Sequence, residues 1–186
     1  LFFYRISVRK EYIQSRERAI GELAENLDTQ IELINTVSIS IIGNSTVRSF
    51  LKETDKTVAM EKQMQTELYQ NAFFSDYIES IYLIDLEGNA CFINYSSIDA
   101  TRKSSFGSEW RERLMEEQGQ AVILLNAGGA YLNYSYDVLS LMRAVFDTDS
   151  QKLIGYLVIN MPVDILADSF ENFWEDTDIY IGCEDM

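Results

Sequence analysis

A seven-residue repeat of apolar side chains at the start of the chain constrains the fold more than any other feature of the sequence. The repeat runs without a gap through Ile6, Ile13, Ile20, Leu27, Ile34 and Ile41. Residues 5–42 contain no proline and one glycine, Gly21. This spacing is typical of the a positions of an amphipathic helix. The sequence therefore predicts a single helix over residues 5–42, roughly 55 Å long at a rise of about 1.5 Å per residue.

The companion d positions of this repeat change along the helix. They are arginines at first, Arg9 and Arg16, and they become apolar later, at Leu23 and Val37. The apolar seam is therefore narrow in the first half of the helix and broad in the second. We interpret the helix as a stalk whose second half packs against a globular body. A long surface helix of an ordinary domain is the alternative.

The first residues of the chain have the composition of the end of a membrane helix. The apolar and aromatic run at residues 1–4 is followed by basic Arg5, Arg9 and Lys10. A complete membrane helix needs about 20 apolar residues, and basic residues often follow such a helix. We expect residues 1–4 to be a membrane-helix remnant, so that the full-length protein is membrane-anchored. An ordinary apolar chain start is the alternative.

Beyond the stalk, helical periodicity gives way to β-rich runs. The expected helices cover residues 45–53, about 54–74 and 107–117. The expected strands cover a hairpin at 80–95 and runs at 121–125, 131–147 and 153–161. Pro162 is expected to open a closing helix, because proline is favoured in the first turn, and a short strand is expected at about 178–183. Antiparallel strands with helices on one side make an α+β domain.

Composition excludes several classes of function. The chain has 15 Lys and Arg against 30 Asp and Glu, and its net charge of −15 repels nucleic acid. It has no histidine, which removes the commonest general base and metal ligand. It has no phosphate-binding loop, nucleophile elbow or metal-ligand pattern. The sequence therefore predicts no enzyme, metal or cofactor in this fragment. Cys91 lies in an apolar run and is expected to be buried, and a bridge to Cys183 is left open.

Three stretches together carry a resemblance to a known family. They are IYLIDLEGN at 81–89 after the long helix, LSLMRAVFD at 139–147 before a polar turn, and LIGYLVINMPVDIL at 153–166. With them the chain resembles the extracellular Cache domain, a PAS-like sensor, of bacterial membrane histidine kinases. The resemblance implies a stalk helix, an antiparallel sheet of five or six strands with flanking helices, and a small-molecule pocket between the sheet and its loops.

The resemblance also implies an organisation and a function. Residues 1–42 are the stalk, residues 43–176 the sensor domain, and residues 177–186 the start of a further strand or of a membrane-proximal module. The implied function is extracytoplasmic sensing of an unknown small-molecule ligand by a homodimer, with signalling through the stalk to a cytoplasmic histidine kinase. The alternative is a ligand-free dimerisation or protein-sensing module, with a chemoreceptor or cyclase output possible.

Five residues are candidates for ligand binding. Trp110 and Arg111, in the short helix, offer a flat apolar wall and a fork of donors. Tyr131 and Tyr134 follow a Gly-Gly turn and suit pocket walls with a polar tip. Arg143 lies in mid-strand on an apolar face, where a buried guanidinium needs a partner. That partner is either a ligand carboxylate or an internal Asp or Glu. The alternative role is core packing for Trp110, and core or surface strand packing for the tyrosines.

Overall fold

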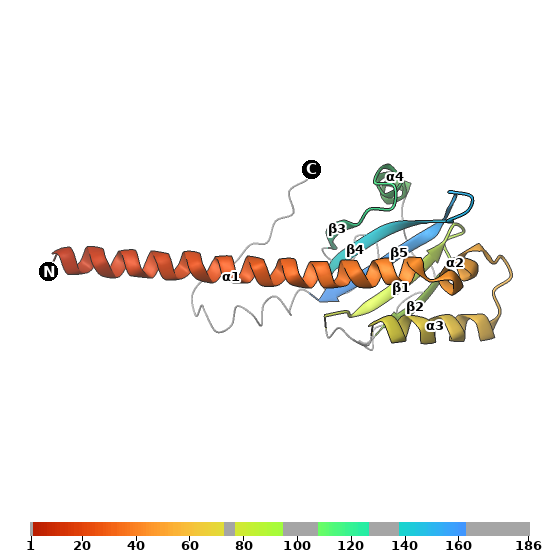
Figure 1. The fold of residues 1–186 in the computed structure, drawn as a ribbon, viewed down its shortest axis with the longest axis horizontal. Helices are drawn as coiled ribbons and strands as arrows, with labels where there is room; N and C mark the ends of the chain where they lie inside the picture. Colours follow the sequence, from red (N-terminus) through yellow and green to blue (C-terminus); the bar gives the residue numbers. More distant parts are fainter. Residues whose placement is uncertain (1, 73–76, 95–107, 127–137, 163–186) are drawn as a thin grey trace.

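A long N-terminal helix dominates the shape of the protein. The computed structural model describes residues 2–72, 77–94, 108–126 and 138–162. Helix α1 covers Phe2–Gly43 and extends far beyond the rest of the described chain (Figure 1). The expected long helix is therefore confirmed. Among the described residues, no helix combines the length and the apolar character that crossing a membrane requires.

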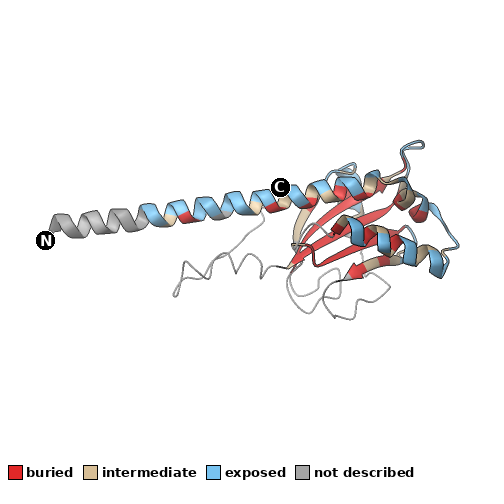
Figure 2. Cartoon of the chain, turned by 60° about the horizontal axis from the view of Figure 1, so that its bottom comes forward, coloured by how far each residue is buried: buried red, intermediate tan, exposed pale blue. Residues whose placement is uncertain are grey.

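The heptad residues of α1 lie in two different environments. Ile34 and Ile41 are fully buried against the body of the domain, and Leu27 is partly buried against it. Ile20 is 61% exposed, and the part of the helix around it extends away from the body (Figure 2). The broad second half of the seam therefore packs within the domain, and the apolar repeat does not form one continuous free surface.

The body of the domain is built on a five-stranded antiparallel sheet with the order β2-β1-β5-β4-β3. The strands are β1 (Ser80–Asp85), β2 (Ala90–Asn94), β3 (Val122–Asn126), β4 (Val138–Phe146) and β5 (Leu153–Pro162). Two hairpins, β1–β2 and β4–β5, have short turns, and β5, the last strand of the described residues, lies between β1 and β4. The α+β class, the stalk helix and the five-stranded sheet agree with the sequence prediction.

The expectation for Pro162 was wrong. Pro162 is the last residue of β5 and pairs with Val138, and it does not open a helix there. Proline has no backbone N–H and cannot donate to the strand ladder, and Pro162 is the last residue of β5 that the structure describes. The expected closing helix after Pro162, the strand at about 178–183 and the module at 177–186 lie outside the described residues.

The helices cover both faces of the sheet, not one. Helices α1, α2 (Ser45–Lys52) and α3 (Val58–Ala72) pack on the face that we call the stalk face (Figure 1). Helix α4 (Ser108–Glu116) packs on the opposite face, which we call the α4 face. The expectation of helices on one side is therefore wrong for α4. Every described residue of β1 is buried, which is the pattern of a strand covered on both faces.

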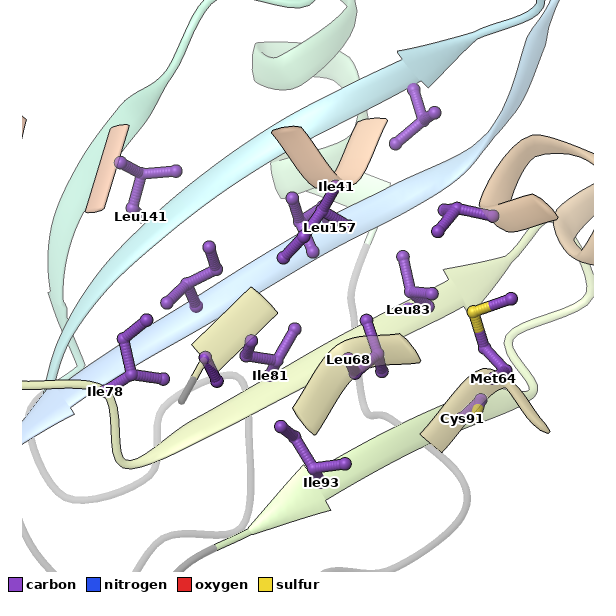
Figure 3. Packing of buried hydrophobic residues seen from close by; sticks show 14 of the residues in the cluster. Ile41, Met64, Leu68, Ile78, Ile81, Leu83, Cys91, Ile93, Leu141 and Leu157 are labelled. Carbon is purple, nitrogen blue, oxygen red and sulfur yellow. The ribbon is translucent and has the colours of Figure 1, made fainter. Parts of the chain in front are cut away.

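The stalk face holds the larger apolar core. Leu68 of α3 and Ile41 of α1 point toward the sheet, where Ile81, Ile93 and Leu157 meet them (Figure 3). All five side chains are almost fully buried, with at most 1% of their surface exposed. Met64 of α3 is buried in the same cluster, so α3 presents an apolar face to the sheet. This packing fixes the second half of α1 against the sheet.

Two lysines near the end of α2 bind the turns of both hairpins. Lys56 Nζ lies 2.7 Å from Asp85 Oδ2 in the β1–β2 turn, and Lys52 Nζ lies 2.5 Å from Asp147 Oδ2 in the β4–β5 turn. Burial alone would raise the pKa of Asp85, but hydrogen bonds from Lys56 and Asn89 leave it below the ordinary value of 3.8. The Lys52 hydrogen bond, with backbone donors of the turn, holds the pKa of Asp147 well below that value. Both turns are therefore held by ionised carboxylates.

Candidate functional site

The α4 face carries a row of polar side chains on an otherwise apolar surface. Ser80 of β1, Asn160 of β5 and Ser140 of β4 are register partners on three adjacent strands. Asn160 Nδ2 donates to Ser80 Oγ at 2.9 Å, and Ser140 Oγ donates to Asn160 Oδ1 at 2.5 Å. All three residues are fully buried. Buried polar groups are costly unless they are hydrogen-bonded. The two hydrogen bonds of this row offset that cost, and they join β1, β5 and β4 on this face.

Aromatic residues occupy the rest of this face. The rings of Tyr82 and Phe92 stack with their centroids 5.3 Å apart. Tyr156 is buried in β5, and Trp110 of α4 is partly buried against the same cluster. Leu114, one turn after Trp110, is fully buried and anchors α4. The face therefore has the apolar, aromatic lining that small-molecule sites usually have.

Arg111 brings a positive charge to the other end of the face. Its guanidinium lies 5.8 Å from the centre of the Tyr156 ring. The Nε atom of Arg111 is buried and makes no hydrogen bond in the part of the chain that the structure describes. Burial raises the pKa of the Tyr156 hydroxyl, and the charge of Arg111 opposes this effect. A buried donor without an acceptor is unfavourable, so a ligand acceptor at this position would be stabilised.

The two polar features lie at opposite ends of one strand. Tyr156 and Asn160 are four residues apart on β5, which is about 13 Å at the usual strand rise. The residues between them on this face, Tyr82, Met142 and Val158, are apolar or aromatic. This arrangement suits an organic molecule with a polar group near Arg111 and an apolar body. Among the described residues no group of acidic or cysteine side chains could hold a metal ion.

Arg143 lies on the opposite face from Trp110 and Arg111. As predicted, it shares its face with Leu139, Leu141 and Val145, and this face is the stalk face. Its guanidinium donates to Ser38 Oγ, to the backbone oxygen of Gly119 and to Asn35 Oδ1. Within the described chain its partners are therefore neutral groups, not the internal carboxylate that the sequence suggested. Burial lowers the pKa of Arg143.

A groove on the stalk side of the molecule is less suited to a charged ligand. It has a volume of about 590 Å³ and lies beside the C-terminal end of α1, with Ile39 and Gln151 on its walls. The cation that lines it, Arg48, already donates to the backbone oxygens of Ile42 and Gly43 at 2.9 and 2.7 Å. The α4 face is therefore the better candidate site.

The structure brings together only part of the set of residues that the sequence suggested. Trp110 and Arg111 share the α4 face, and Arg143 is separated from them by the sheet. Tyr131 and Tyr134 lie outside the described residues. The polar row was missed, although one signal was available: Ser140 and Asn160 are the polar interruptions of two apolar runs, VLSLM and LVINM.

Comparison with known proteins gives matches to solved structures alone. The sequence matches no protein-family model and no curated protein sequence. The sensor domain of the V. cholerae histidine kinase DctB aligns with a TM-score of 0.69 and 13% identity, over 88% of this chain and 61% of that one. This chain thus spans about three fifths of that domain.

Two further structures share the fold. The E. coli DcuS sensor domain has a TM-score of 0.51 and 15% identity, over 76% of this chain and 97% of that one. The ligand-binding domain of the Pseudomonas aeruginosa amino acid chemoreceptor PctC, in complex with GABA, has a TM-score of 0.51 and 11% identity, over 83% and 66%.

All three similar structures are sensor or ligand-binding domains and not catalytic domains. The TM-scores of 0.51 to 0.69 show that this chain shares the fold of these domains. The chain therefore has the fold of the Cache, PAS-like, sensor domains of bacterial histidine kinases and chemoreceptors.

Proposed function

We propose that this chain is the extracytoplasmic sensor domain of a bacterial membrane receptor and that it binds a small molecule on the α4 face. The observation that carries the proposal is the buried Nε of Arg111, which has no hydrogen-bond partner among the described residues and lies beside an apolar, aromatic surface. The similarity to sensor domains supports it, and one of those domains holds GABA. The signal passes through α1 to a cytoplasmic histidine kinase, with residues 1–4 continuing into the membrane anchor.

The proposed ligand carries a hydrogen-bond acceptor that Arg111 binds. Trp110 and Tyr156 form the apolar walls beside that group, and Tyr131 and Tyr134 remain candidates for further walls. An arginine binds carboxylate and phosphate groups with particular geometric specificity, so an organic anion fits this end of the site best. Arg143 is not part of this proposal, because its donors are bound on the stalk face.

A thermal-shift screen of the 186-residue chain tests the proposal. The panel contains amino acids, GABA, other carboxylic acids, sugar phosphates, neutral sugars and amines. A ligand present at about 100 times its Kd stabilises the folded state by about 2.7 kcal/mol, which raises Tm by roughly 5–10 °C for a chain of this size. We expect an anionic class to give this shift. No shift with any class would refute small-molecule sensing by this domain.

Matched arginine variants locate the binding on the α4 face. Arg111→Met should remove the thermal shift, because it removes the donors and keeps the apolar stem. Arg113→Met is the control, since Arg113 lies on the same helix but is not part of the α4-face cluster. A shift that survives Arg111→Met and is lost with Arg113→Met would place the ligand elsewhere.

Dimerisation through the stalk is a second proposal, which the exposure of Ile20 supports. Ile20 belongs to the heptad repeat and is 61% exposed, whereas Ile34 and Ile41 are buried within the domain. A dimer seam is therefore available only in the first half of α1. Sedimentation equilibrium should give a dimer for the chain and a monomer for Ile20→Lys. A monomer at all concentrations up to about 1 mM, far above the usual Kd of a specific complex, would refute it.

A further inference from the structure

Arg143 makes a three-way junction between parts of the chain that lie far apart in sequence. Its Nε donates to Ser38 Oγ at 2.8 Å, and its Nη2 donates to Asn35 Oδ1. Both acceptors are on α1, three residues apart and so on the same side of the helix. Its Nη1 donates to the backbone oxygen of Gly119, at 2.5 Å. One side chain of β4 therefore contacts both the stalk helix and the turn that follows α4.

The Gly119 end of the junction belongs to the turn that closes α4, where Glu117 N and Gln118 N donate to the backbone oxygens of Arg113 and Met115. The turn after α4 contains two residues with positive φ, Gln118 at 50° and Gly119 at 86°. A side chain at Gly119 would contact the backbone oxygen of Ala144 and the ring of Phe146, both at 3.5 Å, so this turn lies close against β4. Because the same turn is hydrogen-bonded to the last turn of α4, we expect a displacement of α4 along the sheet to move the carbonyl group that Arg143 binds.

Stability alone does not account for an arginine at this position. Arg143 is 7% exposed, and within the described chain it has no carboxylate partner, as its three acceptors are neutral. A buried charge is costly, and apolar residues of similar size often stabilise such positions more. The planar guanidinium can nevertheless hold several acceptors in fixed directions at once. The feature that the arginine uniquely provides is the simultaneous contact with three segments.

We propose that Arg143 is a coupling residue, which transmits a displacement of α4 to the stalk helix α1 through its hydrogen bonds to Gly119, Ser38 and Asn35. The proposal rests on the proposed function in one respect, because α4 carries Trp110 and Arg111 of the candidate ligand site. A ligand that moves α4 shifts the Gly119 carbonyl. The guanidinium then follows Gly119 or leaves it, and either change alters its bonds to α1.

Hydrogen exchange in the 186-residue chain tests this coupling without any ligand. Trp110→Ala removes the aromatic contact of α4 and should increase amide exchange in residues 30–41 of α1. We expect an increase of about fivefold or more, the lower end of the usual range for coupled sites. In an Arg143→Met background the same Trp110→Ala change should add nothing. Residues 58–72 of α3 should stay unchanged in all variants, which excludes global destabilisation.

Arg48 offers a matched control. It also donates to α1, at the backbone oxygens of Ile42 and Gly43, but within the described chain it makes no hydrogen bond to the turn after α4. In an Arg48→Met background, Trp110→Ala should therefore still increase exchange in residues 30–41. If Trp110→Ala has no effect on residues 30–41 in the wild type, or has an equal effect with and without Arg143, the proposal is wrong.

A second set of variants keeps the test valid if Arg143→Met does not fold. Asn35→Ala with Ser38→Ala breaks the junction from the helix side and leaves the sheet intact. This double variant should abolish the effect of Trp110→Ala in the same way, and a retained effect overturns the proposal. The two proposals fail separately. A metabolite screen without a hit refutes the ligand site but does not bear on the coupling through Arg143. A hydrogen-exchange experiment that shows no coupling refutes the role of Arg143 but does not bear on ligand binding.

Discussion

The replacement of Gly155 by alanine should be among the most damaging single-methyl changes in the described chain. Gly155 lies in β5, beneath α2, and a Cβ atom there would be 2.5 Å from the backbone oxygen of Ile84 and 2.9 Å from Leu51 Cδ2. Leu51 can change rotamer, but the Ile84 oxygen belongs to the β1 backbone beside β5. The added methyl group therefore has to push β1 and β5 apart or displace α2 from the sheet.

The size of the effect follows from the cost of overpacking a core. Overpacking usually costs about 1–3 kcal/mol, and the backbone clash at Gly155 places it at the upper end, about 3 kcal/mol. For a chain of this length about 2–4 °C of Tm is lost per kcal/mol, so Tm should fall by roughly 6–12 °C. Calorimetry, or thermal unfolding followed by circular dichroism, measures this change.

Gly21→Ala is the matched control for Gly155→Ala. Gly21 lies in the exposed part of α1, and a Cβ atom there would have no neighbour within 4 Å. Alanine in a helix interior is more favourable than glycine by about 1 kcal/mol, so Gly21→Ala should leave Tm unchanged or raise it slightly. A Gly155→Ala variant with the Tm of the wild type would refute the close packing of α2 on β5. Equal losses in both variants would refute the reasoning from local space.

Three other substitutions should change the stability of the domain in ways that follow from the structure. Leu68→Ala should lower the free energy of unfolding by about 2–5 kcal/mol in urea titrations, because the side chain is fully buried, and a loss below about 1 kcal/mol would contradict that burial. Lys56→Met should cost about 2–3 kcal/mol, since it leaves the nearly buried carboxylate of Asp85 without its cation, and an unchanged urea midpoint would contradict this pairing. Asp147→Asn should be less stable than the wild type at neutral pH, because the depressed pKa of Asp147 means that its ionised form is bound in the folded state. This difference should persist below pH 3.8 and vanish only in stronger acid, when the folded-state carboxyl protonates, so a difference that vanishes near pH 5 would contradict the depressed pKa.

Features set by local sequence were predictable. The heptad repeat identified α1 because periodicity over five periods has few alternative explanations. Gly88 marked the β1–β2 turn, and the structure gives it a φ of 86°, a conformation that glycine adopts most easily. Alternation within β4 placed Arg143 correctly on an apolar face.

Features that depend on the order of strands were not predictable. Ser80 and Asn160 are neighbours only because β5 pairs with β1, and they are 80 positions apart in sequence. Asn35 and Arg143 are 108 positions apart, so nothing near Arg143 could identify its acceptor. The side of the sheet that α4 covers is also set by long-range packing. Local preference favoured a helix start at Pro162, but pairing with β4 extended the strand through it.

The position of β5 also determines when the sheet can form during synthesis. A chain that emerges N-terminus first presents β1–β2 and then β3–β4 as two separate units, each with an unpaired edge. These edges stay open until residues 153–162 arrive and pair with both. Unpaired edges of apolar strands are sites of aggregation. The chain therefore needs these edges protected until β5 is inserted, and a chain that ends before Leu153 would have two strand pairs without the central strand that joins them.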